Sequence, residues 1–181
     1  PISYPYTLMV NRDGDRFVDE GADFFDVTYV KYGKAILGQS GSIAYCLFDA
    51  KLAERELVYC LHREFEPLHA STIARLAQNL GLPGDKLQAT VDAYNAAVQP
   101  GDFDPETRDG KATQGLQPPK SNWALPLDTP PYFAFPVTGG ITFTLGGIKV
   151  DERARVIDTE DRAIAGLYAA GELIGGLFYD N

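Results

Sequence analysis

Hydrophobic residues recur at intervals of three and four in two stretches that follow residue 70. The apolar positions are Ile73, Leu76, Ala77 and Leu80 in residues 70–80, and Leu87, Val91 and Tyr94 in residues 86–98. This spacing places the apolar side chains on one face of a helix. Ser71 or Thr72 can cap the first helix, and Gly81 can end it. The pattern therefore predicts a pair of helices joined by a short turn.

Shorter patterns in the first part of the chain predict strands and a turn. Residues 7–10 are strand-like, Asn11–Gly14 is a turn signal, and residues 16–19 resume an extended pattern, which together predict a β-hairpin. We expect residues 24–37 to be helical in part, with the helix ending at Gly38.

A continuous apolar run at residues 43–48 predicts a buried strand, and Asp49 can cap a short helix that follows it. Residues 100–131 are rich in Pro, Gly and Asp, and we expect a long ordered loop rather than a free linker. Its anchors are the hydrophobic side chains Phe103, Leu116, Trp123 and Leu125. From residue 132 onward the pattern predicts short strands, the last of them a buried strand at 166–172.

Composition narrows the class of protein. The formal net charge is −9, which argues against binding to nucleic acid or to an anionic membrane surface. No apolar run is long enough to span a bilayer, and we expect a cytoplasmic protein. We expect the two cysteines, Cys46 and Cys60, to be buried thiols. The spacing of His62 and His69 does not suit a metal site, and we predict none.

The segment GLYAAGE, residues 166–172, combines a strand with a glycine turn. Gly171 permits close approach of a ligand to the backbone, and the carboxylate of Glu172 can accept hydrogen bonds from sugar hydroxyls. By itself this pattern is equally typical of an ordinary strand-to-helix turn. A second glycine turn, TLGG at residues 144–147, lies about twenty residues upstream.

Two further motifs occur nearer the start of the chain. Residues 11–20 (NRDGDRFVDE) match an NxxGxRFxxE signature, and residues 87–98 (LQATVDAYNAAV) match an LxxTVxxYN segment. With the TLGG turn and the GLYAAGE strand, they resemble the fumarate reductase/succinate dehydrogenase flavoprotein family over nearly the whole chain. Within that family, SYPY near the start, TYVKYGKAI, and ITFT with LFYDN are most similar to the tricarballylate dehydrogenases.

The resemblance implies an α+β fold in two parts. Residues 1–135 would form a substrate-capping domain with a β-hairpin, a small sheet and helices. Residues 136–181 would be a β-rich piece of the FAD-binding domain. The implied enzyme uses FAD to dehydrogenate or reduce a carbon–carbon bond in a small polycarboxylate, tricarballylate-like. Its implied partners are the FAD-binding half that this chain lacks and an electron-acceptor protein.

The resemblance also implies roles for individual residues. Carried over by position, the FAD contacts are Gly146, Gly147, Gly171 and Glu172, and the residues near the substrate are Thr142, Phe143 and Thr144. We expect Arg16 and Glu20 of the signature mainly to pair with each other, which is a structural role.

The chain departs from the fumarate reductases at three positions. Phe24 stands where they have a proton-donating arginine, Phe143 stands where they have a substrate-binding histidine, and Ser3 stands about where they have a second arginine. These departures argue against fumarate reduction and leave the acid/base group unknown. Its candidates are Tyr4, Tyr29, Lys31 and Tyr32, or a group outside this chain, although a single tyrosine is more often a core-edge aromatic.

No GxGxxG motif follows a strand anywhere in the 181 residues. Without it the pyrophosphate of FAD has no glycine turn and no helix N-terminus to bind. Because both ends of the sequence resemble the middle of a longer polypeptide, we expect a piece of a longer flavoprotein. We expect this piece to bind no FAD and to be inactive by itself. The alternative is a stand-alone capping or binding module without catalysis.

Overall fold

A computed structural model of the chain describes residues 3–55, 57, 66–141 and 146–177. The chain divides into two compact units, Pro1–Gly139 and Gly140–Asn181. The division falls a few residues after the boundary that the resemblance implies. The mixture of helices and sheet agrees with the predicted α+β class.

The first unit is built on a four-stranded antiparallel sheet with the order β1-β2-β4-β3. The strands are β1 (Leu8–Asn11), β2 (Ala44–Asp49), β3 (Leu68–Ala70) and β4 (Tyr132–Val137). In the register of the central pairs, Leu47 lies opposite both Leu8 of β1 and Ala134 of β4. The apolar runs at 43–48 and 132–137 thus form strands as predicted.

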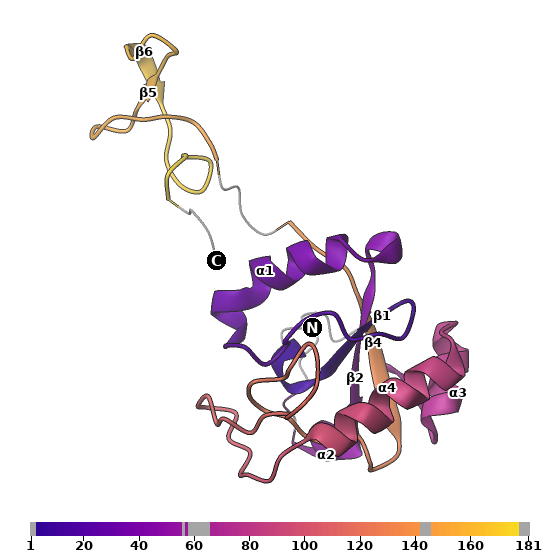
Figure 1. Cartoon of the computed structure of the whole chain (residues 1–181). Coiled ribbons are helices and arrows are strands. Elements are labelled where there is room, and N and C mark those ends of the chain that lie inside the picture. Colours follow the sequence, from indigo (N-terminus) through magenta and orange to yellow (C-terminus); the bar gives the residue numbers. More distant parts are fainter. Residues whose placement is uncertain (1–2, 56, 58–65, 142–145, 178–181) are drawn as a thin grey trace. The chain divides into compact units, whose positions relative to one another are not determined.

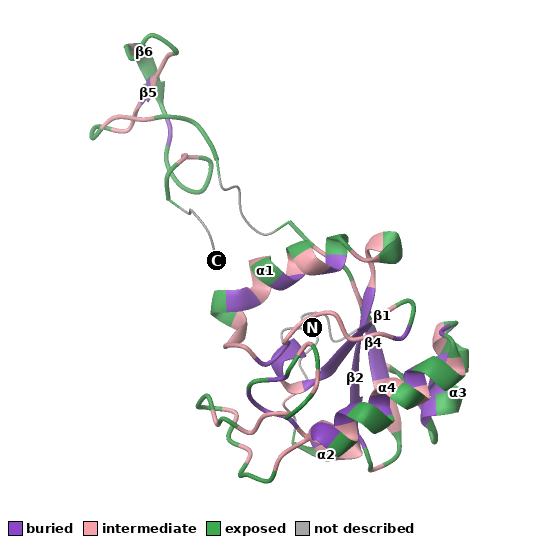
Figure 2. Ribbon diagram, in the orientation of Figure 1, coloured by how far each residue is buried: buried purple, intermediate pink, exposed green. Residues whose placement is uncertain are grey.

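Helices cover both faces of this sheet (Figure 1). The helix α1 (Phe25–Leu37) lies on one face, and the pair α3 (Ile73–Leu80) and α4 (Gly84–Ala97) lies on the other. All six residues of β2 are buried (Figure 2). Because successive side chains of a strand point to opposite faces, Tyr45 and Leu47 join the core under α3 and α4, whereas Cys46 joins the core under α1.

The predicted helix caps are confirmed. Asp49 accepts a hydrogen bond from the Lys51 amide at the start of α2 (Ala50–Glu54). Thr72 accepts one from the Arg75 amide at the start of α3, and Gly81 ends α3 with a left-handed backbone at φ 69°. Such a φ favours glycine, which has no Cβ to clash with the preceding turn.

The predicted β-hairpin after β1 is wrong in its second strand. The turn is present, because the Asn11 side chain accepts hydrogen bonds from the amides of Asp13 and Asp15. Beyond the turn, the described residues form a single isolated β-bridge, between Val10 and Arg16, in place of a second strand. The amide of Met9 donates instead to the carboxylate of Glu20 at 3.0 Å, so a side chain replaces the backbone acceptor of a second strand.

The long loop between α4 and β4 is ordered, as predicted. Trp123 is fully buried, and its indole N–H donates to the carbonyls of Asp104 and Thr107 at 2.8 and 2.9 Å. Phe103 and Leu125 pack against one hydrophobic cluster, and Leu116 packs against another. These anchors offset the entropy cost of fixing a loop of this length.

The second unit contains a two-stranded antiparallel sheet of β5 (Arg155–Ile157) and β6 (Ala163–Tyr168). The last strand therefore ends before Gly171, and it is mostly exposed, which corrects the expectation of a buried strand at 166–172. Among the described residues of this unit, only Val156 and Ala169 are buried. Residues 142–144 of the strand expected in GITFT, residues 140–144, fall outside the described residues. No helix in the described part of the chain has the length and hydropathy of a membrane span.

Candidate functional site

The two glycine turns predicted to contact FAD lie against each other in the second unit. The amide of Ile148, directly after the TLGG turn, donates to the carbonyl of Leu173 at 2.9 Å. The amide of Gly175 donates back to the carbonyl of Ile148 at 3.1 Å. This short parallel bridge brings the segment 146–148 beside the segment 171–175, so the four predicted cofactor residues belong to one local structure. We call it the glycine junction.

The glycines of the junction serve two different purposes. A Cβ on Gly147 would lie 2.6 Å from the Gly175 amide nitrogen, so the absence of a side chain there lets the turns pack. A Cβ on Gly146 or Gly171 would meet no atom within 4 Å, and Gly171 has a left-handed backbone at φ 83°. Gly146, Gly171 and Glu172 are exposed, so their backbone lies at the surface of the unit. Such a surface fits the close approach of a flavin nucleotide.

The predicted substrate residues cannot be placed on this junction. Thr142, Phe143 and Thr144 lie outside the described residues.

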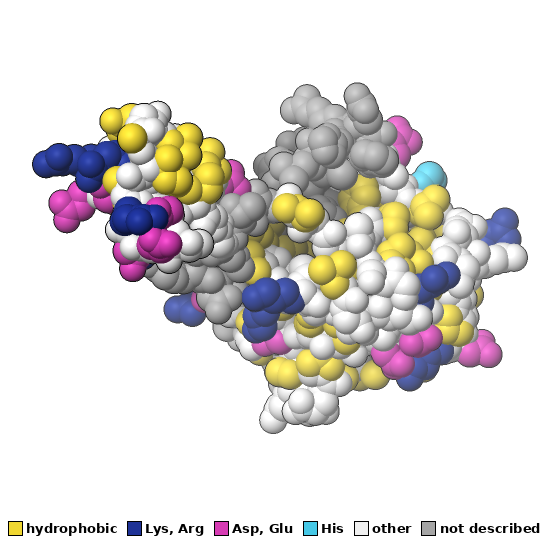
Figure 3. All heavy atoms as spheres, turned by 90° about the horizontal axis from the view of Figure 1, so that it is seen from above, with side chains coloured by type: hydrophobic (Ala, Val, Ile, Leu, Met, Phe, Trp, Pro, Cys, Tyr) yellow, Lys and Arg dark blue, Asp and Glu magenta, His cyan; other side chains and the backbone are white. Residues whose placement is uncertain are grey.

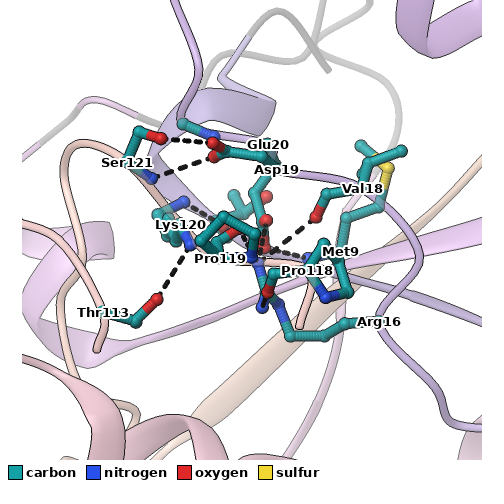
Figure 4. Close-up of polar contacts among 12 residues, drawn as sticks. Met9, Arg16, Val18, Asp19, Glu20, Thr113, Pro118, Pro119, Lys120 and Ser121 are labelled. Atoms are coloured by element: carbon teal, nitrogen blue, oxygen red, sulfur yellow. Dashed lines mark hydrogen bonds and ion pairs between the residues drawn. The ribbon is translucent and has the colours of Figure 1, made fainter. Parts of the chain in front are cut away.

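The first unit contains a buried charge cluster (Figure 4). The guanidinium of Arg16 and the carboxylate of Glu20 pair at 2.5 Å, with their side chains 4% and 0% exposed. This confirms the predicted pairing. Arg16 also donates to the carbonyls of Pro118 and Pro119, the second at 3.1 Å. The pair therefore connects the start of the chain to the long loop.

Lys120 is the member of this cluster that the sequence did not reveal. Its side chain is fully buried, and Nζ donates to the carbonyls of Pro5 at 2.6 Å and Thr7 at 2.7 Å. Burial lowers the pKa of its ammonium to about 8, an effect that the nearby Glu20 carboxylate opposes and the Arg16 guanidinium reinforces. A lone lysine between prolines and a tryptophan carries no motif that would mark it.

Residues 19–21 and 121–122 interlock beside Lys120. The Asp19 carboxylate accepts hydrogen bonds from the amide and hydroxyl of Ser121, the first at 3.0 Å. The Asn122 amide group donates to the Gly21 carbonyl at 2.8 Å. A Cβ on Gly21 would clash with the backbone of Asn122, so glycine is required for this contact.

The acid/base candidates lie on or beside α1 in different environments. The hydroxyl of Tyr4 lies 2.6 Å from Thr28 Oγ1, and that of Tyr32 donates to the Asp19 carbonyl. Burial raises the pKa of both phenols well above the ordinary value, which keeps them protonated. Tyr29 is half-buried and stacks on Phe25, whereas Lys31 is exposed. Tyr29 and Lys31 are thus the more accessible of the four.

Phe24 stands directly before α1 and packs on the long loop. Its ring centroid lies 5.2 Å from that of Trp123, and Tyr6 packs on the same indole at 5.5 Å. Phe24 is only partly buried. At this position the chain therefore presents an aromatic surface rather than a cationic proton donor.

The chain is similar in sequence to a family of known proteins. Residues 5–179 match the family model described as an FAD binding domain. The chain is 34% identical over 171 residues to a probable fumarate reductase, Ifc3, of Shewanella frigidimarina, covering 94% of the chain and 26% of that protein. It is 32% identical to the 4-oxocyclohexanecarboxylate 2-dehydrogenase of Sinomonas cyclohexanicum, covering 92% of the chain and 31% of that protein.

A similar solved structure is the open conformation of a flavocytochrome c3 fumarate reductase. It aligns with a TM-score of 0.70 at 29% identity, over 97% of this chain and 28% of that one. The chain thus spans about a third or less of the length of each of these proteins.

Proposed function

The chain belongs to the FAD-binding-domain family of fumarate reductase-like flavoproteins, and we propose that it forms a substrate cap and one part of the flavin site of an FAD-dependent oxidoreductase. The reaction is the removal or addition of two hydrogens at a carbon–carbon bond of a small carboxylate. Bound FAD would supply the hydride acceptor or donor for this step.

The observation that carries the proposal is the glycine junction. Gly146, Gly171 and Glu172 are exposed together, and Gly147 is fixed by its contact with the second turn. In the proposed enzyme these four residues hold FAD through backbone groups and the Glu172 carboxylate. The first unit, with its sheet between α1 and the pair α3–α4, is then the cap over the substrate.

For the substrate we propose a polycarboxylate of the tricarballylate type, oxidised rather than reduced. The motifs SYPY, TYVKYGKAI and LFYDN support this choice. Phe24, packed on Trp123, cannot donate a proton as the arginine of the fumarate reductases does, which argues against fumarate reduction. Thr142, Phe143 and Thr144 would lie near the substrate.

The proton that leaves the substrate needs an acceptor. Tyr29 and Lys31 lie two positions apart on α1, and both are more accessible than Tyr4 and Tyr32. We propose that the neutral amine of Lys31 or the phenolate of Tyr29 accepts this proton, because a group that exchanges protons with a substrate must be reachable. Tyr4 instead ties the start of the chain to Thr28 of α1.

The second unit points to a further polypeptide as partner. Figure 3 shows hydrophobic side chains gathered on this unit. The exposed ones include Ile148, Ile164, Leu167, Tyr168, Leu173 and Leu177. A unit that buries so little is stabilised by packing against more protein. We propose that the covering partner is the part of the flavoprotein that carries the GxGxxG half, and that an electron-acceptor protein completes the reaction cycle.

The test is an assay of the longer flavoprotein that contains this chain. We expect bound flavin, and oxidation of tricarballylate with an artificial electron acceptor. Fumarate reduction and 4-oxocyclohexanecarboxylate oxidation serve as comparison reactions. A flavin-containing protein that reduces fumarate would overturn the proposed substrate assignment. A protein without flavin that still binds carboxylates would support the alternative of a non-catalytic binding module.

A further inference from the structure

Residues 109–124, which we call the strap, are cross-linked by hydrogen bonds within the segment, and the strap is joined to the end of α4 by backbone pairing of its residues 112–114 with residues 97–99. The amide of Thr113 donates to the Lys120 carbonyl at 2.9 Å, and the amide of Lys120 donates to Thr113 Oγ1 at 2.8 Å. The Ala124 amide donates to the Lys111 carbonyl at 2.8 Å. Because these bonds lie within the strap, they can survive its separation from the rest of the unit.

The strap is attached to the first residues of the chain around Lys120. Arg16, Asp19 and Gly21 bond to its residues 118–119, 121 and 122. At the centre, the ammonium of Lys120 is fully buried, and both hydrogen bonds described for it go to neutral carbonyls. The carboxylate of Glu20, which favours the charged form of Lys120, is engaged with Arg16 and the Met9 amide. Burying a charge without a directly paired opposite charge is unfavourable.

We propose that the strap opens as a unit, and that opening is linked to proton binding by the buried amine of Lys120. In the closed strap the amine has no access to water. In the open strap it becomes hydrated, and its charge is stabilised. The inference does not depend on the proposed function.

The direction of the linkage follows from the surroundings of Lys120. Burial lowers its pKa in the closed strap to about 8, with Glu20, Asp19 and Cys46 opposing the shift and Arg16 adding to it. In the open strap the ordinary lysine value, about 10.4, applies. Between these values the open form binds a proton that the closed form lacks. The opening constant therefore falls by up to about tenfold per pH unit as the pH rises through this window.

Opening would change the surface beside α1. Trp123 is part of the strap, and both Tyr6 and Phe24 pack on its indole. Release of the strap would uncover these aromatic rings. Proton binding by Lys120, by opening the strap, would therefore increase the solvent exposure of the aromatic ring of Phe24.

Trp123 makes the opening measurable, because it is the only tryptophan in the chain. The experiment follows Trp emission and far-UV circular dichroism during urea titrations of the 181-residue protein at several pH values from about 7 to about 9.5. We expect Trp123 to become exposed before the helices unfold. The midpoint of the emission change should rise with pH in the wild type and not in Lys120→Met.

Lys111→Met is the matched control. Lys111 lies in the same strap, and its Nζ also donates to two carbonyls, those of Gln99 and Gly101, but it is only partly buried. This variant should keep the wild-type pH dependence. Equal pH dependence in Lys120→Met, or coincidence of the two signals at every pH in the wild type, would overturn the proposal.

A second measurement covers the case in which Lys120→Met does not fold. The wild-type protein is labelled with carbon-13 at the lysine ε positions and titrated by NMR. A Lys120 resonance that titrates well below the ordinary lysine value supports the linkage. Titration at the ordinary value overturns it.

Discussion

Gly147 and Gly175 pack backbone against backbone in the second unit, so closely that a Cβ on Gly147 would lie 2.6 Å from the Gly175 amide nitrogen. The contact holds Gly147 and Ile148 beside the segment 173–175, which follows the last strand. It explains why two glycine motifs more than twenty residues apart occur together. At position 147 a glycine is required by the packing. At position 146 the glycine leaves the backbone exposed.

The first prediction separates these two uses of glycine. Gly147→Ala should destabilise the second unit by about 1–3 kcal/mol, because the new methyl group forces the turns apart. Limited proteolysis followed by mass spectrometry should then show faster cleavage within residues 146–177. Gly146→Ala is the control, since a Cβ there meets no atom within 4 Å. Equal cleavage of both variants would contradict the packing role of Gly147.

The second prediction concerns the buried pair of Arg16 and Glu20. Arg16→Met should lower the free energy of unfolding by about 3–5 kcal/mol, because it leaves the buried Glu20 carboxylate without its partner. Denaturant titration measures the change. Lys86→Met is the control, because its ion pair with Asp15 is about half exposed and should contribute about 1 kcal/mol or less. A loss in Arg16→Met no larger than in the control would mean that the cluster is not stabilising.

The third prediction concerns the thiol of Cys46. Burial raises its pKa to about 11 from an ordinary value of 9.0. In a Cys60→Ser background, a thiol reagent at neutral to mildly alkaline pH should label Cys46 only as fast as the protein opens. Rapid labelling of the native protein would show that Cys46 is accessible.

The same shift gives a fourth prediction, for stability at high pH. Between about pH 9 and 11 the folded protein keeps a thiol proton that the unfolded chain releases. This contribution to the free energy of unfolding is therefore present below pH 9 and is lost as the pH rises, by up to about 1.4 kcal/mol per pH unit. Comparison of urea titrations with those of Cys46→Ala isolates it. The decline should be smaller in the variant.

The fifth prediction tests FAD binding by this chain alone. The junction offers exposed glycines and Glu172, and the 181 residues contain no GxGxxG turn for the pyrophosphate. After mixing with FAD and desalting, we expect no visible flavin absorbance. A stable stoichiometric yellow complex would show that the chain has a complete site.

The elements that the sequence predicted well are those whose signals are local. The helix α3 combines apolar spacing with Thr72 and Gly81 at its ends, and all of these act within a few residues. The second strand of the hairpin was predicted wrongly because the Glu20 side chain, not a backbone carbonyl, accepts from Met9. The β-strand propensity of residues 16–19 does not reveal that a side-chain carboxylate takes the place of a backbone carbonyl as the acceptor.

Long-range contacts explain what the sequence left out of the candidate site. Lys120 bonds to carbonyls 115 and 113 residues earlier in the chain, and carbonyl acceptors carry no residue signature. The glycines of the junction were recognisable in the sequence, because glycine is itself the signal for close backbone approach, but their contact with each other was not predicted. Even there, the sequence did not distinguish Gly147, which packs, from Gly146, which stays open.

The strand β2 contributes to three hydrophobic clusters. Tyr45 and Leu47 face α3 and α4, and Cys46 faces α1, whereas Phe48 lies in a third cluster with Leu52 and Phe135. Because no residue of this strand faces solvent, any change of side-chain volume in it disturbs the packing on one face of the sheet or the other. The helices on either face, by contrast, each contact one core and can vary independently. Over evolutionary time, we expect β2 to drift most slowly, while the two helical layers diverge at separate rates.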